Sequence, residues 1–177
     1  PSDNDLKKCW VGINTSLPNK LIRNLIEANC LEKQFGAIST IKAEVVYGME
    51  GKSRIDLLLK PEINNTDKRD IYVEVKNTTW CEKTLALFPD TVTTRGQKHL
   101  MELMSICNNS RAVLIPCISR SDMEIFAPCD LADPLYGKLF REAVAKGVEV
   151  IPCSFGFFID HITWEGVKPF FLSENSK

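Results

Sequence analysis

Apolar residues near the start of the chain follow the spacing of an amphipathic helix. They recur every three or four positions, which places them on one helix face. These residues are Leu17, Leu21, Ile22, Leu25 and Ile26. Thr15 or Ser16 is expected to cap this helix, with Pro18 in its first turn. The pattern therefore predicts a first helix that packs one face against a core.

Three segments after this helix have the composition of β-strands. Residues 41–47, 53–59 and 71–76 are rich in Val, Ile, Leu and Tyr. A tight turn at residues 48–52 and a polar loop at residues 61–69 separate them. Three consecutive strands joined in this way predict a β-meander.

The second half of the chain alternates helices and strands. After a longer loop at residues 80–93, Thr94 is expected to cap a helix, and residues 112–118 form an apolar run typical of a buried strand. Asp133 precedes a further helix, and residues 148–151 predict a further strand. A strand–helix–strand order favours a parallel crossover. The sequence therefore predicts an α/β fold with a mixed β-sheet flanked by helices.

Two of the predicted strands carry candidate catalytic residues, which are Asp56, Glu74 and Lys76. Alternate residues of a strand point to opposite faces, so Glu74 and Lys76 share one face and the neighbouring valines take the other. Asp56 is expected to point towards the same site, because Ile55 and Leu57 take the other face of its strand. The pattern predicts that the three polar side chains meet.

The chemistry of these residues is that of a metal-dependent phosphodiesterase. The carboxylates of Asp56 and Glu74 are hard oxygen ligands suited to Mg²⁺ or Mn²⁺. A lysine beside them can activate a water or stabilise developing phosphoryl charge, which is the role expected for Lys76. Without metal the two carboxylates repel each other. Replacing either with alanine is therefore expected to leave the metal-free melting temperature unchanged or slightly raised.

An ordinary solvated strand is the alternative interpretation of these residues. A Glu-x-Lys pair usually forms a surface ion pair, and Asp56 could pair with Arg54 or Lys76. The strands at residues 53–59 and 71–76 are, however, apolar enough for a sheet covered on both faces, where charged groups are costly without a partner or a role. The order of elements also matches the helix–β–β–β–helix–β core of PD-(D/E)xK nucleases.

Composition and charge place the chain among ordinary globular domains. Hydrophobic residues make up 44% and charged residues 25% of the 177 positions, which fits one domain with a core. The net charge of −1 counts mildly against a non-specific nucleic-acid binder. Seven cysteines without a C-x-x-C pair argue against a disulfide framework and against a structural zinc site, and so for a reducing compartment.

The chain resembles the sugar fermentation stimulation protein A (SfsA) family over roughly residues 10–155. The motifs that carry the resemblance are WVGINTSLPN at 10–19, SRID at 53–56, YVEVKN at 72–77, FPD at 88–90, RGQKHL at 95–100, PCD at 128–130 and GVEV at 147–150. The polar segment at residues 64–67 and the number of cysteines depart from the family pattern. The cysteines suggest a eukaryotic or otherwise divergent source.

The resemblance implies a DNA-binding protein linked to sugar use, with an N-terminal OB-like domain and a PD-(D/E)xK nuclease-like domain. Residues 1–12 are then expected to be a linker or a remnant of a missing OB-like domain. Residues 13–172 correspond to the nuclease-like domain, and residues 173–177 form a polar tail.

The predicted helix after the third strand supplies the expected nucleic-acid contacts. Its first turn carries Arg95, Gln97 and Lys98, and a helix N-terminus favours a phosphate. Glu44 is either an outer-shell carboxylate of the metal site or a solvated strand residue. Asp90 either caps a loop or reaches the metal.

These observations predict a nucleic-acid-binding domain with a Mg²⁺- or Mn²⁺-dependent phosphodiesterase site. The alternative is a non-catalytic DNA-binding regulator that keeps a nuclease fold. His99 is expected to form structural hydrogen bonds rather than to act as a base. The expected partner is nucleic acid, most simply DNA, with no membrane. The expected location is the cytoplasm, with the nucleus or an organelle as alternatives.

Overall fold

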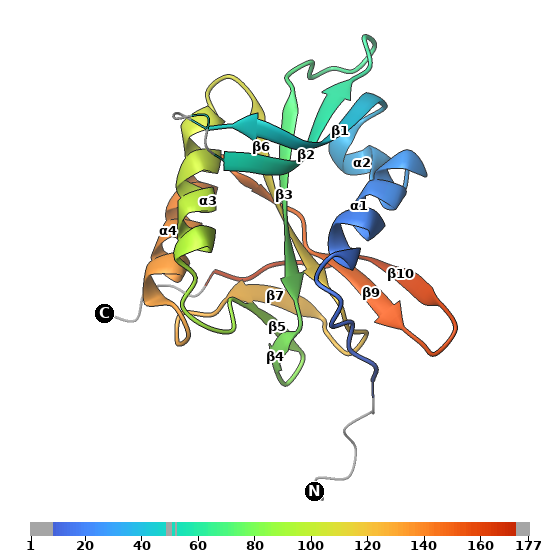
Figure 1. Ribbon diagram of the computed structural model, residues 1–177, viewed down its shortest axis with the longest axis vertical. Helices are drawn as coiled ribbons and strands as arrows, with labels where there is room; N and C mark the ends of the chain where they lie inside the picture. The colour runs from blue at the N-terminus through green and yellow to red at the C-terminus, as the bar shows by residue number, and fades with distance from the viewer. Residues whose placement is uncertain (1–8, 49–50, 52, 173–177) are drawn as a thin grey trace, which may run out of the picture.

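A mixed sheet flanked by helices, which the sequence predicts, forms the centre of the molecule, and in the described residues it has seven strands (Figure 1). The computed structural model describes residues 9–48, 51 and 53–172. Outside these residues lie the expected polar tail, the first eight residues of the expected linker, and three residues of the expected turn at 48–52.

The elements follow the predicted order with additional short strands. The helices are α1 (Leu17–Glu27), α2 (Glu32–Phe35), α3 (Thr94–Ile106) and α4 (Pro134–Ala145). The strands are β1 (Ile38–Tyr47), β2 (Ser53–Pro61), β3 (Ile71–Thr78), β4 (Trp80–Glu82), β5 (Leu85–Phe88), β6 (Arg111–Ile118), β7 (Ile125–Pro128), β8 (Glu149–Val150), β9 (Cys153–Phe157) and β10 (Ile162–Val167).

The main sheet has the order β1-β2-β3-β6-β9-β10, and β8 also pairs with β6. The first three strands form the predicted antiparallel meander, whereas β3 and β6 are parallel. The parallel crossover predicted for the later strand–helix–strand unit is confirmed, because the chain passes from β6 through α4 to β8, which pairs parallel with β6. The chain also reaches β6 from β3 by way of β4, β5 and α3. The apolar run of β6 is buried, as expected for a central strand with both faces covered.

Two apolar cores cover the two faces of the sheet. One lies under α1 and α2, where Ile22 and Phe35 pack with Val73 and Val75 of β3. The other lies under α3 and α4, where Leu100 and Phe140 are members of the second buried cluster. Figure 1 shows the two helix pairs on opposite sides of β3. Both faces of β3 are therefore screened from bulk solvent.

The second strand changes direction at Asp56, which the pattern of residues does not predict. Ile55 belongs to the core under α3, whereas Leu57 belongs to the core under α1. The expectation that these two residues share one face is therefore wrong. Between the pairs Ala43–Leu57 and Val45–Ile55, Glu44 has a φ of 54°, a conformation that is uncommon for a residue with a side chain. This local irregularity accompanies the change of face.

The bend exposes the edge of β3. The ladder between β2 and β3 runs over the pairs Leu57–Val73, Leu58–Tyr72 and Leu59–Ile71, and within the described chain it goes no further. The second half of β3 therefore keeps β6 as a neighbour but has lost β2 on its other side. This open edge is where Glu74 and Lys76 lie.

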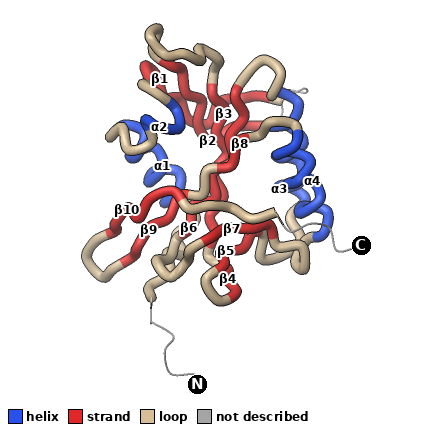
Figure 2. Tube along the Cα trace, turned by 180° about the vertical axis from the view of Figure 1, so that it is seen from behind, coloured by secondary structure: helices blue, strands red, loops and turns tan. Residues whose placement is uncertain are grey.

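A second, three-stranded sheet replaces the loop predicted at residues 80–93. It has the order β4-β5-β7 and lies at the end towards which β3 runs (Figures 1 and 2). The strand predicted at residues 148–151 is also different. It is reduced to the two residues of β8, and pairing continues in β9 after Pro152.

The helix ends show small shifts from the sequence analysis. Ser16 occupies the N-cap position of α1, but Asn14 Oδ1 accepts the hydrogen bonds there, from the Ser16 backbone N–H and hydroxyl. Helix α3 is capped by Thr93 rather than Thr94, because the Thr93 hydroxyl accepts from the Gly96 N–H at 3.1 Å. Asp133 precedes α4 as expected, and its side chain caps this helix by accepting from the Tyr136 N–H.

All seven cysteines lie in the described residues and are free thiols. Burial raises the pKa of the Cys117 thiol to about 12, so this thiol stays protonated. None of the helices in the described ranges has the length and apolar character needed to cross a bilayer.

Candidate functional site

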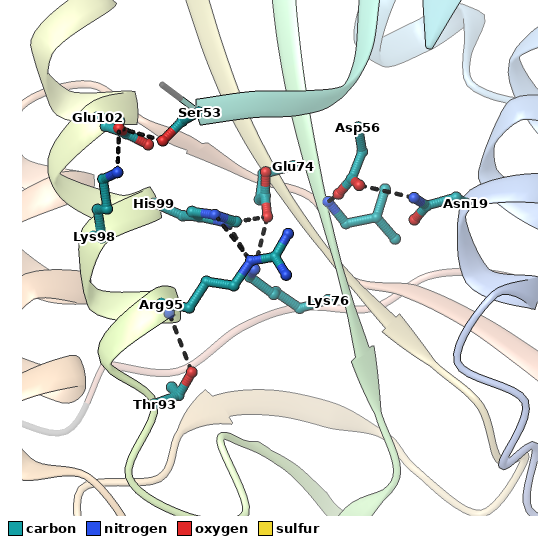
Figure 3. A network of polar contacts seen from close by, with 12 residues as sticks. Asn19, Ser53, Asp56, Glu74, Lys76, Thr93, Arg95, Lys98, His99 and Glu102 are labelled. Atoms are coloured by element: carbon teal, nitrogen blue, oxygen red, sulfur yellow. Dashed lines mark hydrogen bonds and ion pairs between the residues drawn. The ribbon is translucent and has the colours of Figure 1, made fainter. Parts of the chain in front are cut away.

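Glu74 and Lys76 form a buried ion pair on the side of β3 that faces α3. Lys76 Nζ donates to Glu74 Oε1 at 2.7 Å, and the two side chains are 13% and 3% exposed. Figure 3 shows both directed towards the same turn of α3. The shared strand face predicted for this pair is confirmed, and a solvated surface pair is wrong for it.

His99 of α3 holds this pair in place. Its Nδ1 contacts Glu74 Oε1 and lies 3.0 Å from Lys76 Nζ. Arg95 Nε lies 3.5 Å from His99 Nε2. The carboxylate oxygen of Glu74 accepts, so Nδ1 of His99 donates to it, and Nε2 is placed towards the Arg95 guanidinium. His99 therefore forms structural hydrogen bonds, as expected, and it lies at the centre of the site.

Burial and polar contacts act in opposite directions on Glu74. Burial disfavours its ionised form, but the hydrogen bond from His99 and the charge of Lys76 outweigh burial, so the pKa of Glu74 lies below its ordinary value. Glu74 is therefore a carboxylate at neutral pH.

Among the described residues, the second oxygen of Glu74 has no hydrogen-bond partner, although it is buried. The same holds for Glu102 Oε2 and for the hydroxyl groups of Tyr47 and Tyr136. Burial first, and then the charge of Glu74, raise the pKa of both tyrosines, so their hydroxyls stay protonated. Buried polar atoms in this state usually contact an ion or water. The region around Glu74 is therefore suited to a bound polar species.

Asp56 lies in the opening that the bend creates between β2 and β3. Its Oδ2 accepts from the Val75 backbone N–H at 2.7 Å, and its Oδ1 accepts from the Asn19 side-chain amide of α1 at 2.8 Å. Its carboxylate thus replaces the missing strand partner at the edge of β3. Figure 3 shows Asp56 directed towards Asn19 and Glu74 directed towards His99.

The charge of Asp56 is disfavoured by its surroundings. Burial raises its pKa above the ordinary value of 3.8, and the negative charge of Glu74 raises it further. The hydrogen bonds from Val75 and Asn19 and the charge of Lys76 act in the opposite direction but do not cancel this effect. Asp56 and Glu74 therefore interact electrostatically, and a cation between them would relieve their repulsion.

The donor set fits a hard divalent cation better than zinc. Within the described residues no group of three or more His, Cys, Asp or Glu side chains is arranged to hold a metal. Asp56 and Glu74 could supply two oxygen ligands, with water or a phosphate oxygen completing the shell, as is usual for Mg²⁺. The buried unpartnered Oε2 of Glu74 is the observation that supports this fit.

The first turn of α3 has a mixed role. Arg95 and Lys98 are exposed, and Lys98 Nζ lies 3.6 Å from Glu102 Oε1 in an i,i+4 pair. Gln97, in contrast, donates from its amide to both carboxylate oxygens of Asp133, at 2.9 and 3.0 Å. These contacts link α3 to the N-cap of α4, and the nucleic-acid contact expected for Gln97 stays a prediction.

Replacing Gln97 with alanine should lower stability rather than nucleic-acid binding. Hydrogen bonds to charged groups contribute about 1.5–3 kcal/mol, so we expect a loss of that order in the free energy of unfolding, measured in urea. An unchanged unfolding midpoint together with a weaker salt dependence of nucleic-acid binding would restore the expected phosphate role.

The two expected outer-shell carboxylates lie away from these contacts. Glu44 is exposed on β1, and Asp90 is exposed after β5. Among the described residues, neither takes part in the hydrogen bonds of Asp56 or in those that join Glu74 to Lys76 and His99. Their metal role stays a prediction.

Sequence reasoning did not identify Glu102 and Ser53 as neighbours of the site. The Ser53 hydroxyl donates to Glu102 Oε1 at 2.5 Å, which ties the start of β2 to α3. Glu102 lies three residues after His99 on the same helix, and this i,i+3 spacing was the available signal. Its partner could not be found from spacing, because it lies 49 residues away in the chain.

Comparison with known proteins agrees with the resemblance seen in the sequence. The family model described as "Sugar fermentation stimulation protein RE domain" matches residues 16–160. A sugar fermentation stimulation protein homolog from Prochlorococcus marinus strain NATL2A is 76% identical over 177 residues, which are all of this chain and 69% of that protein. A homolog from Parasynechococcus marenigrum strain WH8102 is 64% identical over 161 residues, 91% of this chain and 63% of that protein.

A solved structure is also similar to the chain. Pyrococcus furiosus SfsA, determined in complex with Ca²⁺, has a TM-score of 0.79 and 26% identity, and the match covers 88% of this chain and 64% of that one. The chain thus spans about two thirds of the length of these relatives. The curated relatives are bacterial, which gives no support to the eukaryotic source or the nuclear location suggested by the cysteines. The chain belongs to the sugar fermentation stimulation protein (SfsA) family.

Proposed function

We propose that this chain binds nucleic acid and cleaves phosphodiester bonds with the help of a divalent metal, in a PD-(D/E)xK nuclease-like site. The observation that carries the proposal is the ionised, buried Glu74, which lies beside Asp56 at an open strand edge and whose Oε2 has no partner within the described part of the chain. The Ca²⁺ complex of Pyrococcus furiosus SfsA supports divalent binding at the level of the family.

Asp56 and Glu74 would hold Mg²⁺ or Mn²⁺, which when bound lowers the pKa of water and polarises a phosphoryl oxygen. His99 donates to Glu74 Oε1 and so orients the carboxylate, as partners of metal ligands commonly do. Lys76 places its positive charge beside this carboxylate, where it can stabilise negative charge developing on a phosphate. We propose these roles for the three residues named from the sequence.

Arg95 and Lys98 would bind the nucleic-acid backbone. Both are exposed cations in the first turn of α3, where they oppose the helix dipole and gain no stability from it. Replacing both with alanine should weaken binding equally for all sequences and reduce the slope of log Kd against log salt by about 1.8 for duplex DNA, if each cation contacts one phosphate. Fluorescence anisotropy across a salt series measures both quantities.

Lys138 provides a matched control for this double variant. It is exposed on α4 and pairs with Glu142 at i,i+4, at 3.9 Å, much as Lys98 pairs with Glu102. Lys138→Ala should leave the affinity and the salt slope unchanged. If the double variant of Arg95 and Lys98 behaves like Lys138→Ala, the phosphate role is wrong.

A non-catalytic DNA-binding regulator is the second candidate. The observation that favours it is that Asp56 and Glu74 already have protein partners, so the site is stable without metal. Labelled single- and double-stranded DNA and RNA, incubated with Mg²⁺ or Mn²⁺ and in parallel with EDTA, separate the two functions. Metal-dependent cleavage of any substrate supports the nuclease. Binding of DNA without cleavage under all metal conditions supports the regulator.

A further inference from the structure

A small pocket lies along the open edge of β3, beyond the candidate catalytic residues. Its volume is about 250 Å³. Its lining includes Thr15, Asn77, Thr79, Trp80, Phe88 and Asp90. These residues come from three places: the segment before α1, the end of β3, and the small sheet with the loop that follows it. The pocket is smaller than a site for a drug-sized molecule, so it suits one ring system.

The position of the pocket relates it to the candidate site. Asn77 follows Lys76 directly on β3, about 3.3 Å further along the strand, and its side chain points to the face opposite that of Lys76, so the pocket lies at the end of the strand next to the candidate site. Within the described chain, β2 no longer pairs with this part of β3, so the edge is open to an approaching ligand. A phosphate at Glu74 and Lys76 would leave an attached nucleoside close to the pocket.

The lining has the chemistry that recognises a flat polar heterocycle. Trp80 is 55% exposed although it lies in a strand of the small sheet, so its ring is not buried in a core and is free to stack on a ligand. Phe88 adds a second aromatic wall. Asp90, Thr15 and Thr79 supply acceptors and hydroxyl groups, which can pair with the edge of a base.

Asn77 has a defined orientation in this pocket. Its Oδ1 accepts from the Ser119 hydroxyl at 2.6 Å, which fixes the amide group at the end of β3. An amide held in this way is a preorganised hydrogen-bonding group. The pocket therefore combines an aromatic platform with fixed polar groups.

We infer that this pocket binds one unpaired nucleobase of the nucleic acid, stacked on Trp80, next to the phosphate at the candidate metal site. The inference rests on the proposed function and specifies its substrate as single-stranded, or as a strand with a base turned out of the duplex. A base paired within a regular duplex is stacked between its neighbours and cannot enter the pocket. Stacking on an aromatic ring tolerates different bases, so the pocket adds affinity more than sequence specificity.

The test compares two strands with three variants, using the 177-residue chain in EDTA so that no cleavage occurs. The probes are a short fluorescein-labelled single-stranded DNA of mixed sequence and the same backbone with abasic sites. Trp80→Ala should raise the Kd for the base-bearing strand about 5- to 150-fold, the range for loss of one base–aromatic stack. Trp80→Phe should keep most of the affinity, and the abasic strand should bind wild type and Trp80→Ala alike.

Trp10→Ala is the matched control. Trp10 is 60% exposed but lies outside the lining of the pocket, so this variant should bind both strands as wild type does. The salt dependence should be the same for wild type and Trp80→Ala, because stacking releases no counterions. Melting curves of each variant identify any loss of folding. If Trp80→Ala unfolds, wild type alone still tests the inference, because it should bind the abasic strand more weakly than the base-bearing strand, and equal binding of the two strands would overturn the inference.

The outcomes separate this inference from the proposed function. If both Trp80 variants bind the base-bearing strand as tightly as wild type, the pocket inference is wrong while nucleic-acid binding stands. An equal loss of affinity for the abasic strand would also overturn it, since the effect would then be on the backbone or the fold. If wild type binds neither strand nor any other nucleic acid, both the inference and the proposed function are wrong.

Discussion

Replacing Glu74 with alanine is expected to abolish metal-dependent cleavage and to lower the free energy of unfolding by about 3–5 kcal/mol, the usual cost of leaving a buried charge without its partner. The side chain is 3% exposed and its partner Lys76 is 13% exposed. The variant would leave Lys76 and His99 without their shared acceptor. Repulsion from Asp56, which led to the expectation of unchanged or higher stability, is outweighed by these lost contacts.

Glu74→Gln separates the two effects. Its amide oxygen can still accept from Lys76 and His99, so most of the stability should remain while the charge needed for a divalent ion is lost. Calorimetric titration with Mn²⁺ should show the loss of binding, and the cleavage assay should show the loss of activity. Because the pKa of Glu74 is lowered, the stability gained from its charge is present above its ordinary value of 4.5. It is lost as the pH falls through the lower folded value.

Glu149 is a suitable control for this series. It forms a bidentate ion pair with Arg111 at 2.7 Å at another position of the same sheet, and it is 37% exposed. Glu149→Gln should cost less stability, because exposed pairs contribute less, and should leave cleavage intact. Retention of Mn²⁺ binding and cleavage by Glu74→Gln would show that Glu74 is a structural residue only.

The part of the site that sequence could predict is the part that depends on short-range periodicity. Glu74 and Lys76 share a face because a strand repeats every two residues, and the valines beside them pack into the core under α1. The apolar character of β3 and β6 also indicated a sheet covered on both sides. These inferences need no knowledge of distant contacts, which is why they hold in the structure.

The bend at Asp56 could not be predicted from the two-residue repeat of a strand. Strict alternation puts Ile55 and Leu57 on one face, but the twist at Glu44 and Asp56 sends them into different cores. No glycine or proline marks this position, so the residue types give no signal. The outcome depends on which core each half of the strand can fill, and only the packed structure determines that.

Contacts between distant residues explain the other differences. Gln97 looks like a polar residue at an exposed helix start, yet its partner Asp133 lies 36 positions further along the chain. The small sheet was also missed, because β4, β5 and β7 are three- or four-residue strands whose pairing partners are partly far away. Short segments of this kind carry too few residues for periodicity to distinguish strand from loop.

Variants of Asp56 distinguish a structural role from a metal-binding role more sharply than variants of any other residue of the site. The Asp56 carboxylate accepts a hydrogen bond from the Val75 N–H at the edge of β3. The same carboxylate is repelled by the negative charge of Glu74. Asparagine at this position keeps an oxygen for the Val75 N–H, and Asn19 can turn its amide to accept from the new side chain. Alanine removes both acceptors. Asp56→Asn should therefore fold well, and Asp56→Ala should lose about 1–3 kcal/mol from the unpaired N–H.

The pH dependence of stability without metal tests this assignment further. A carboxyl group whose pKa is raised on folding destabilises the folded state at neutral pH, and the penalty disappears as the pH falls through the raised value towards the ordinary 3.8. Asp56→Asn removes the penalty. In urea unfolding with EDTA it should therefore equal or exceed wild type at neutral pH, and its advantage should shrink as the pH falls into this window.

With metal present the order should reverse. Mn²⁺ should raise the melting temperature of wild type by mass action, and it should raise that of Asp56→Asn far less, because one of its two proposed carboxylate ligands is gone. Glu44→Gln, which alters an exposed carboxylate next to the same bend, should respond to Mn²⁺ as wild type does if Glu44 is only solvated. Equal metal-induced shifts for wild type and Asp56→Asn would mean that Asp56 closes the strand edge and does not bind the ion.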